Sequence, residues 1–397
     1  MQPIYLDYQA TTPLASEAQA AMEPWLGQKF GNPHSPHRMG REAKAGVEFA
    51  REQVASLIRS SRAKSRGDSP SWEKRPSTEF GTSEAGHGQV VFTSGATEAA
   101  NLALKGAAWA APPNRRKIVT LAIEHACVLD TVLWLGSHGF EAVVLPVGHD
   151  GIVDLDTVRE AVDDRTAIVA AMLVNNEIGV IQPVAEIGRI AREAGALFFC
   201  DAVQGLGRVP LPDADLIAVS AHKLFGPKGV GALWLRGGVA LEPLMHGGAQ
   251  EAGIRSGTLS PALCTGFGAA AALAAVRSAE DTAHVERLWS LAVARLRGWT
   301  INGSTERRYR GNLNVRADGL DAARLISDVR GVAFSAGSAC ASGSGRPSHV
   351  LKAIGLSDAE ARSSIRLGFG RYTSEEELER ALDLILAAAA AQGLKAA

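Results

Sequence analysis

The sequence has only four cysteines in 397 residues, and this scarcity excludes several kinds of protein. Cys127, Cys200, Cys264 and Cys340 lie far apart in the chain, and none of them belongs to a C-x-x-C pair. A disulfide-stapled extracellular fold is therefore not expected, and neither is a cysteine-based zinc site. The sequence predicts no bound metal.

The chain also lacks an excess of charge of either sign. Its formal net charge of −1 gives no electrostatic reason to expect a nucleic acid or an anionic membrane as a partner. The longest apolar runs are shorter than the ~20 residues that cross a bilayer. The sequence also begins without the basic start and apolar stretch of a signal peptide. We therefore predict a cytoplasmic protein with no nucleic-acid and no membrane partner.

What the chain does contain is a regular alternation between residues 88 and 257. Segments with helical spacing or turn residues separate short apolar runs rich in β-forming residues, namely QVVFT, KIVTLAI, EAVVLPV, TAIVAAMLV, ALFFCDAV, DLIAVS and GVGALWL. This alternation predicts an α/β fold with a mostly parallel sheet flanked by helices. Ligands bind beyond the carboxyl ends of the strands in such sheets.

The composition changes near residue 260, where a long helical region rich in alanine leads to shorter strand-like pieces. We predict a large α/β domain over 16–258 and a smaller α+β domain formed by 1–15 and 259–397. Residues 59–88 are rich in Ser, Gly, Pro and charge and lack apolar periodicity. They predict a long and mobile surface excursion from the large domain.

Polar residues follow several of the predicted strands. QVVFT runs into SGATEAANL, where a small-residue turn opens a helix whose free backbone N–H groups suit a phosphate. The ends of the later strands supply further polar side chains, in chain order His125, Asn176, Asp201, Gln204, Ser220, His222 and Lys223. These side chains are expected to meet at one edge of the sheet.

Asp201 and Lys223 allow two interpretations. They could form a salt bridge with each other, since a buried carboxylate needs a cation or several donors. Alternatively, they could hold two ends of one cofactor. Pyridoxal 5′-phosphate requires a lysine for a Schiff base, a carboxylate for the pyridinium nitrogen and a phosphate cup. All three features lie at predicted strand ends here, and this combination favours the cofactor.

The sequence resembles a known family, the cysteine desulfurases of the NifS/IscS branch. These are class V, fold-type I enzymes dependent on pyridoxal 5′-phosphate. The matching stretches cover nearly the whole chain and are LDYQATTPL, FGNPHSPHRMGR, FTSGATEAANLAL, EHACV, VNNEIGVIQP, CDAVQGLGRVP, SAHKLFGPKGVGAL, GIRSGTLS, SAGSACASG and SSIRLGFGR. The sequence departs from the family in the length of 59–88 and at Ala249 and Ala252, where glycine and arginine are more usual.

The resemblance implies a role for each matching residue. Lys223 would bond to the cofactor and later move the substrate's Cα proton, and Asp201 would pair with the pyridinium nitrogen. Gln204 would hydrogen-bond the ring hydroxyl, while His125 would stack on the ring and help to transfer protons. Asn176 would lie beside the ring and the substrate. The phosphate would be held by Ala96, Thr97, Ser220 and His222.

Three further implications concern the substrate and the assembly. Arg366 would hold the substrate carboxylate through its fork of donors. In this family the residue that matches Thr258 reaches the phosphate of the other subunit, which implies a homodimer. Cys340 would attack the sulfur of L-cysteine, so that a persulfide forms on the protein and L-alanine is released. The glycine- and serine-rich loop 335–346 would be a mobile tether that delivers the sulfur.

The resemblance leaves the sulfur acceptor open. An iron–sulfur scaffold that binds transiently, with Cys340 ligating a cluster in the complex, is one option, and tRNA-thiolation or nitrogenase-assembly proteins are others. Two alternatives to the desulfurase also stand. One is a selenocysteine lyase or another transferase on the same scaffold, such as an aminotransferase, although Cys340 argues against the aminotransferase. The other is a non-catalytic scaffold, against which the set of Asp201, Lys223, Cys340 and Arg366 argues.

Overall fold

The structure is a computed structural model that describes residues 3–65, 88–336 and 347–393. At its centre is a seven-stranded sheet in the order β2-β8-β7-β6-β5-β3-β4. Neighbouring pairs among β3 to β7 are parallel, whereas β8 runs antiparallel to both of its neighbours. The predicted mostly parallel sheet is thus confirmed, and its strands are β2 (Gln89–Thr93), β3 (Lys117–Leu121), β4 (Glu141–Leu145), β5 (Thr166–Met172), β6 (Leu197–Asp201), β7 (Leu216–Ser220) and β8 (Gly231–Leu235).

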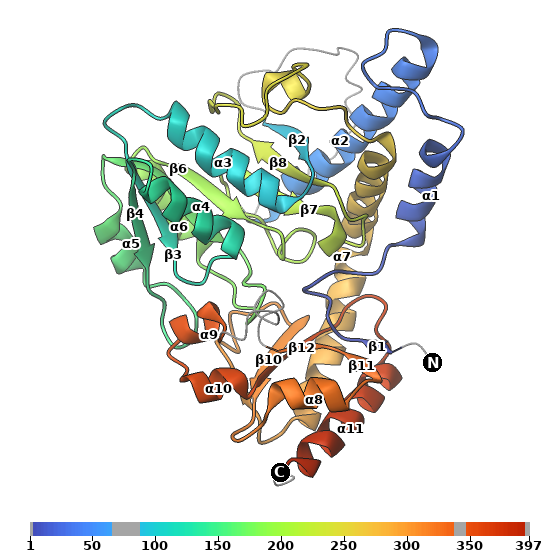
Figure 1. Cartoon of the computed structure of the whole chain (residues 1–397), viewed down its shortest axis with the longest axis vertical. Coiled ribbons are helices and arrows are strands. Elements are labelled where there is room, and N and C mark those ends of the chain that lie inside the picture. Colours follow the sequence, from blue (N-terminus) through green and yellow to red (C-terminus); the bar gives the residue numbers. More distant parts are fainter. Residues whose placement is uncertain (1–2, 66–87, 337–346, 394–397) are drawn as a thin grey trace.

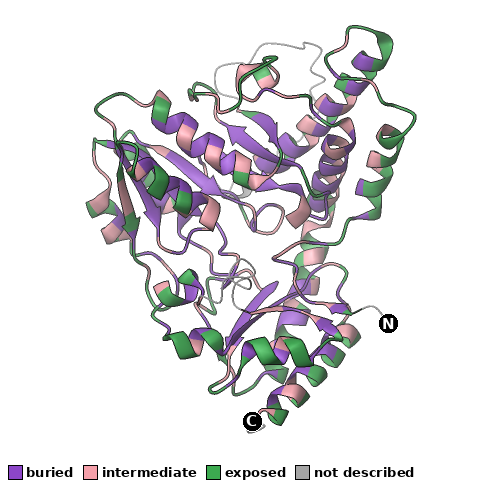
Figure 2. Cartoon of the chain, in the orientation of Figure 1, coloured by how far each residue is buried: buried purple, intermediate pink, exposed green. Residues whose placement is uncertain are grey.

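Both faces of this sheet are buried because helices cover both of them (Figure 1). Side chains of a strand alternate between faces, so Phe199 of β6 packs with α3 (Ala96–Ala110) and α4 (Ala126–Gly136). Its neighbour Phe198 packs with α2 (Arg38–Ser65) and α6 (Val184–Glu193). The helix α5 (Leu155–Ala161) packs beside α6. Strands apolar on both faces are typical of such sandwiched parallel sheets, and Figure 2 shows their buried ribbon.

A second core is built around smaller sheets from the last third of the chain. The strands β9 (Thr300–Ile301), β10 (Asn312–Arg316), β12 (Ser335–Ala336) and β13 (Ser364–Gly368) form an antiparallel sheet. The N-terminal β1 (Ile4–Tyr5) joins this part by pairing in parallel with β11 (Val332–Ala333). The helices nearby are α8 (Ala322–Asp328), α9 (His349–Ala353), α10 (Asp358–Arg362) and α11 (Glu375–Ala391).

One helix, α7 (Pro261–Arg295), belongs to both cores. Its first half contributes Phe267 to the core of the large sheet, and its second half contributes Trp289 to the second core. By length and composition α7 could cross a membrane, but here it packs along α2 and α1 (Ser16–Leu26). The division of the chain at residue 258 stays a prediction, because α7 links the two parts without a break.

The sequence-based prediction for 59–88 is wrong at its beginning. Residues 59–65 do not leave the fold, because they continue the helix α2 to Ser65. Ser61 is buried there and its carbonyl accepts a hydrogen bond from the backbone N–H of Leu211. The polar composition of this segment favours a loop, but the segment is helical because it packs against the loop after β6. Residues 66–87 lie outside the described part of the chain.

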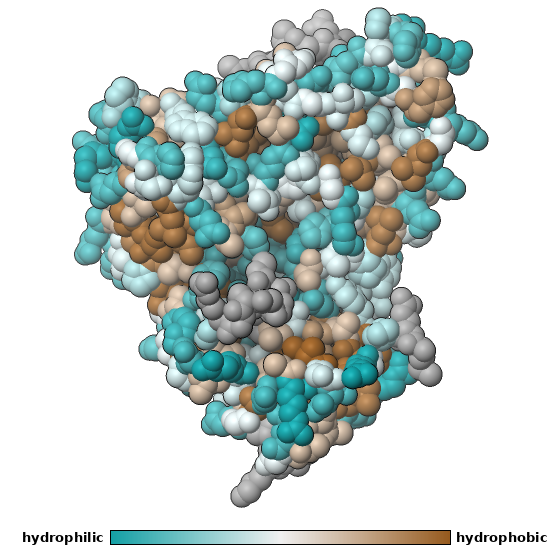
Figure 3. All heavy atoms as spheres, in the orientation of Figure 1, coloured by the Kyte–Doolittle hydropathy of each residue, from teal (hydrophilic) through white to brown (hydrophobic). Residues whose placement is uncertain are grey.

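The outer surface mixes hydrophilic side chains with separate hydrophobic groups (Figure 3). One polar cluster ties the end of α2 to the large sheet. Asp213 forms ion pairs with Arg62 of α2, with Arg192 at the end of α6 and with Arg236 after β8. Burial by itself would raise the pKa of Asp213, but the hydrogen bonds from Arg236 and Arg62 outweigh it and lower the pKa to about 2.

This cluster generates a prediction for stability. A lowered pKa means that the ionised carboxylate stabilises the fold at neutral pH and that this contribution is lost as the pH falls from ~4 towards the folded value. We expect Asp213→Asn to lower the melting temperature at pH 7 by ~2–4 °C, with a smaller difference from wild type below pH 4. Asp156→Asn, which removes an exposed pair with Arg159, is the matched control. Equal melting of both variants at pH 7 would contradict the prediction.

Candidate active site

A cavity of about 420 Å³ opens at the carboxyl ends of β5, β6 and β7. Its position follows from the parallel strands, whose carboxyl ends lie at one edge of the sheet. All of the site residues predicted from the sequence except Cys340 and Thr258 line it, namely Ala96, Thr97, His125, Asn176, Asp201, Gln204, Ser220, His222, Lys223 and Arg366. Segments that span most of the chain length therefore meet here.

Asp201 ends the apolar strand β6 and is 6% exposed. Its carboxylate accepts a hydrogen bond from the backbone N–H of Val203 at 3.0 Å. Burial raises the pKa of Asp201, while the nearby His125 and Lys223 oppose that rise. A carboxylate in such surroundings is stabilised by a positive group bound next to it.

Lys223 lies on the short turn that follows β7. Its Nζ donates to the backbone carbonyls of Gln9 and Ala10, at 2.6 Å each. The N-terminal stretch is held against this turn by Thr12, whose N–H and hydroxyl donate to the carbonyl of His222 and whose hydroxyl accepts from the N–H of Phe225. The amine is thus fixed in the cavity wall by a segment more than 200 positions away.

The opposite end of the cavity presents donors suited to an anion. The helix α3 begins there with Gly95 as its N-terminal cap, so its first N–H groups face the cavity rim. The start of β8 lies so close that a Cβ at Gly231 would meet the backbone of Gly95 at 2.7 Å. Burial, with Lys223 and Lys228 nearby, lowers the pKa of His222 to about 4. His222 is therefore neutral at pH 7 and binds through hydrogen bonds rather than charge.

His125 caps the start of α4 with its side chain. Its Nδ1 accepts a hydrogen bond from the backbone N–H of Cys127 at 3.1 Å, so the proton of the neutral ring is on Nε2. Burial lowers the pKa of His125, and Lys223 acts in the same direction, while Asp201 opposes both. The ring is therefore a neutral group in a cavity that the acid and the amine also line.

Arg366 enters the cavity from β13 of the other core and is 1% exposed. One of its terminal nitrogens contacts Asp7 at 2.7 Å, and the other donates to the carbonyl of Asn176 at 3.1 Å. Its Nε is buried with no hydrogen-bond partner among the described residues. The guanidinium is thus held rigidly and keeps an unused donor, an arrangement that suits a bound carboxylate.

These groups fit pyridoxal 5′-phosphate. The buried Asp201 favours a protonated nitrogen next to it, and the start of α3 with Ser220 and His222 offers donors for a phosphate. Lys223 lines the same cavity. Among the described residues no group of three His, Cys, Asp or Glu side chains could hold a metal ion.

Two predicted residues are not part of the described cavity. Thr258 is exposed and is absent from the cavity lining. Cys340 and most of the loop 335–346 lie outside the described residues. Cys127 also lines the cavity, although no role is predicted for it from the sequence, and burial raises its pKa above the ordinary thiol value. A thiol that stays protonated is a poor nucleophile.

Sequence reasoning missed the partners that hold the site residues in place. Gln9 and Ala10 hold Lys223 through backbone carbonyls, and Asp7 holds Arg366. In the sequence the stretch LDYQATTPL carries only a family resemblance, and its acid before a tyrosine is the one signal that could mark Asp7. Carbonyl contacts leave no trace in the side-chain sequence.

The sequence is similar to that of known proteins. The family model of the class-V aminotransferases matches residues 4–65 and 83–381. A cysteine desulfurase IscS of Rickettsia rickettsii is 42% identical over 394 residues, which cover 96% of this chain and 90% of that protein. The corresponding protein of Rickettsia africae is 41% identical with the same coverage.

Solved structures give the same result. A NifS-like protein superposes with a TM-score of 0.84 at 34% identity, covering 97% of this chain and 98% of its own. A structure of SspA in complex with cysteine superposes with a TM-score of 0.77 at 33% identity, covering 93% and 99%. The chain therefore belongs to the class-V aminotransferase family and, within it, to the cysteine desulfurases.

Proposed function

We propose that this chain removes sulfur from L-cysteine with pyridoxal 5′-phosphate bound in the cavity, releases L-alanine and carries the sulfur as a persulfide on Cys340. The observation that carries the proposal is the convergence of Asp201, Lys223, His125 and Arg366 on one cavity. The family is dependent on this cofactor, and the relatives are named cysteine desulfurases.

When bound, the cofactor withdraws electrons from the substrate Cα and so makes its proton acidic. Asp201 would hold the ring nitrogen protonated, and its raised pKa reflects the need for that positive partner. Gln204 would donate to the ring oxygen and His125 would stack on the ring. Asn176 would lie beside the ring and the substrate.

The phosphate would be held at the start of α3. Ser220 is buried there, and His222 is neutral because burial lowers its pKa, so both would bind the phosphate as hydrogen-bond partners. Ala96 and Thr97 would add the N–H groups of the first helical turn. This end fixes the direction of the cofactor in the cavity.

Lys223 would bond the cofactor covalently and then move the Cα proton of the substrate. The Lys223 amine lies in the cavity wall against two backbone carbonyls. When the substrate amine takes its place on the cofactor, the Lys223 amine would therefore remain close to the substrate Cα. Arg366 would bind the substrate carboxylate, since its guanidinium is buried and keeps an unpaired donor. Together the two residues would orient the Cα–H bond toward the base.

Cys340 would supply the nucleophile. Its thiolate attacks the substrate sulfur, the carbon–sulfur bond breaks, and its electron pair remains on the three-carbon fragment that is released as alanine after protonation. Cys127 is a less suitable nucleophile because burial raises its pKa. The sulfur would pass to an acceptor protein such as an iron–sulfur scaffold, and we propose a cytoplasmic homodimer in which Thr258 reaches the partner's phosphate site.

The two cysteines give a direct test. Cys340→Ala should keep the visible absorption of the bound cofactor but lose sulfide release from L-cysteine by at least ~100-fold, because the nucleophile is missing. Cys127→Ala is the matched variant and should still form a persulfide. The measurement is sulfide release together with mass spectrometry of the protein persulfide. Sulfide release by Cys340→Ala at the wild-type rate would refute the persulfide route.

Arg366 gives a test of substrate binding. Arg366→Gln should raise KM for L-cysteine by at least ~30-fold, equivalent to ~2 kcal/mol, because a buried charge-assisted contact to the carboxylate is lost. Arg316→Gln changes an arginine of the same small sheet outside the cavity and serves as the control. Steady-state kinetics of both variants decide the question. An unchanged KM in Arg366→Gln would assign the carboxylate to another residue.

A further inference from the structure

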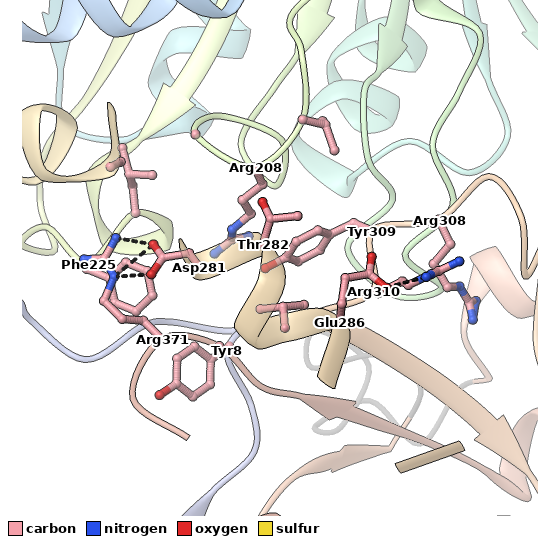
Figure 4. Close-up of a pocket in the computed structure, with 16 residues that line it drawn as sticks. Tyr8, Arg208, Phe225, Asp281, Thr282, Glu286, Arg308, Tyr309, Arg310 and Arg371 are labelled. Atoms are coloured by element: carbon pink, nitrogen blue, oxygen red, sulfur yellow. Dashed lines mark hydrogen bonds and ion pairs between the residues drawn. The ribbon is translucent and has the colours of Figure 1, made fainter. Parts of the chain in front are cut away.

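A second cavity lies next to the turn that carries Lys223, since the following residues Leu224 and Phe225 line it. It has a volume of about 130 Å³ and lies among α7, the turn after β6 and the loop that leads to β10. Figure 4 shows that Arg208 extends into this cavity above Tyr309, toward the side chains of α7. The guanidinium carbon of Arg208 lies 5.1 Å from the centre of the Tyr309 ring. Neither the sequence pattern nor the proposed mechanism gives Arg208 a role.

The described hydrogen bonds of Arg208 go to two residues that line the first cavity. Its Nη1 donates to the side-chain Oε1 of Gln204 at 3.1 Å and to the Gln204 carbonyl at 3.2 Å. Its Nη2 donates to the carbonyl of Lys223 at 2.5 Å. Gln204 and Lys223 both line the large cavity, whereas Arg208 lines the small one. Arg208 therefore forms part of the wall between the two cavities and hydrogen-bonds two site residues from the side of the small cavity.

These contacts decide which way the amide of Gln204 faces. A guanidinium offers only donors, so the group that faces Arg208 must be the amide oxygen. The amide nitrogen correspondingly donates to the carbonyl of Gln9 at 3.0 Å. The flipped amide would set two donors against each other at Arg208 and two acceptors against each other at Gln9. Gln204 is 4% exposed, so water does not relieve such a mismatch.

The fixed orientation has a chemical consequence. The amide nitrogen carries two hydrogens, and one of them is taken by Gln9. The other is available for an oxygen atom in the cavity that Gln204 lines. The short sequence spacing supports the arrangement, because residues four positions apart lie on one side of a helical turn and the segment after Asp201 forms such turns.

We propose that Arg208 is a positioning residue: it holds Gln204 as a donor toward the ring oxygen of the cofactor and fixes the carbonyl of Lys223. This inference rests on the proposed function, since it needs the cofactor in the large cavity. A donor at the ring oxygen stabilises negative charge on that oxygen. It therefore favours the deprotonated form of the bound cofactor and lowers the pKa of the cofactor. Loss of that donor therefore raises the pKa of the bound cofactor.

The test is a pH titration of the visible absorption band of the purified holoenzyme. Arg208→Met should raise the midpoint of the titration by at least ~0.5 pH unit. Arg208→Lys keeps a donor and should stay nearer to wild type. Arg310→Met is the matched control, since Arg310 lines the same small cavity but forms an ion pair with Glu286 and has no described contact with Gln204 or Lys223.

A double variant separates the role of Gln204 from a general charge effect. Gln204→Leu should raise the midpoint as Arg208→Met does, and the double variant should shift no further than the larger single shift, because both changes remove one interaction. If Arg208→Met does not accumulate as folded holoenzyme, Arg208→Leu, which also offers no donor, replaces it with the same expected direction.

Three results would each overturn the inference. The first is a midpoint for Arg208→Met within ~0.1 pH unit of wild type, and the second is full additivity in the double variant. A shift in Arg310→Met as large as that of Arg208→Met would likewise overturn it, because net charge would then be the cause. A wild-type protein that shows no visible cofactor band would instead refute the proposed function.

Discussion

The cost of burying the Asp201 carboxylate governs the organisation of this molecule. The strand β6 carries this acid to the end of an otherwise apolar strand, where burial raises its pKa and only one backbone hydrogen bond to the carboxylate is described. Such a group is kept charged by positive groups placed against it. Lys223, on the turn after β7, lines the same cavity and opposes the rise in the pKa of Asp201, and the neutral imidazole of His125 lines this cavity as well. The cost of burying this carboxylate thus favours a positive group bound in the cavity that Asp201 lines.

The site is supported from outside the large sheet as well. The N-terminal stretch crosses the cavity, and its backbone carbonyls accept from Lys223 while Asp7 orients Arg366. Arg366 itself comes from the small sheet, so the substrate end of the cavity depends on contact between the two cores. Arg208 reaches Gln204 and Lys223 from the rear. Lys223 is thus held partly by Gln9 and Ala10, which line the cavity themselves, whereas Asp7 and Arg208 act from outside the lining.

Much of the fold could be predicted from the sequence because the apolar runs indicate the strands and the turn residues indicate where the strands end. The parallel sheet is such a case, and so is the clustering of strand-end residues such as Asp201 and Lys223, since topology brings those ends together. The helical residues 59–65 could not be predicted, because their polar composition resembles a loop and only packing against Leu211 reveals the helix. The composition of a segment reflects its local conformational preference, whereas tertiary contacts decide which conformation the segment adopts.

Contacts through the backbone and from distant segments also could not be predicted. Gln9 acts through its carbonyl, which every residue possesses, and Arg208 has the sequence surroundings of an ordinary turn arginine. Cys340 is the opposite case, since the sequence singles it out while it lies outside the described residues. Its role comes from its chemistry and from the family resemblance rather than from geometry.

The central claim is that Lys223 is the amine that bonds the cofactor. The most direct measurement is borohydride reduction of the holoenzyme followed by proteolysis and mass spectrometry of the peptides. The account predicts that the added mass of the reduced cofactor is found on Lys223 alone. The same mass on Lys228, which lines the same cavity, or on no lysine at all, would contradict it.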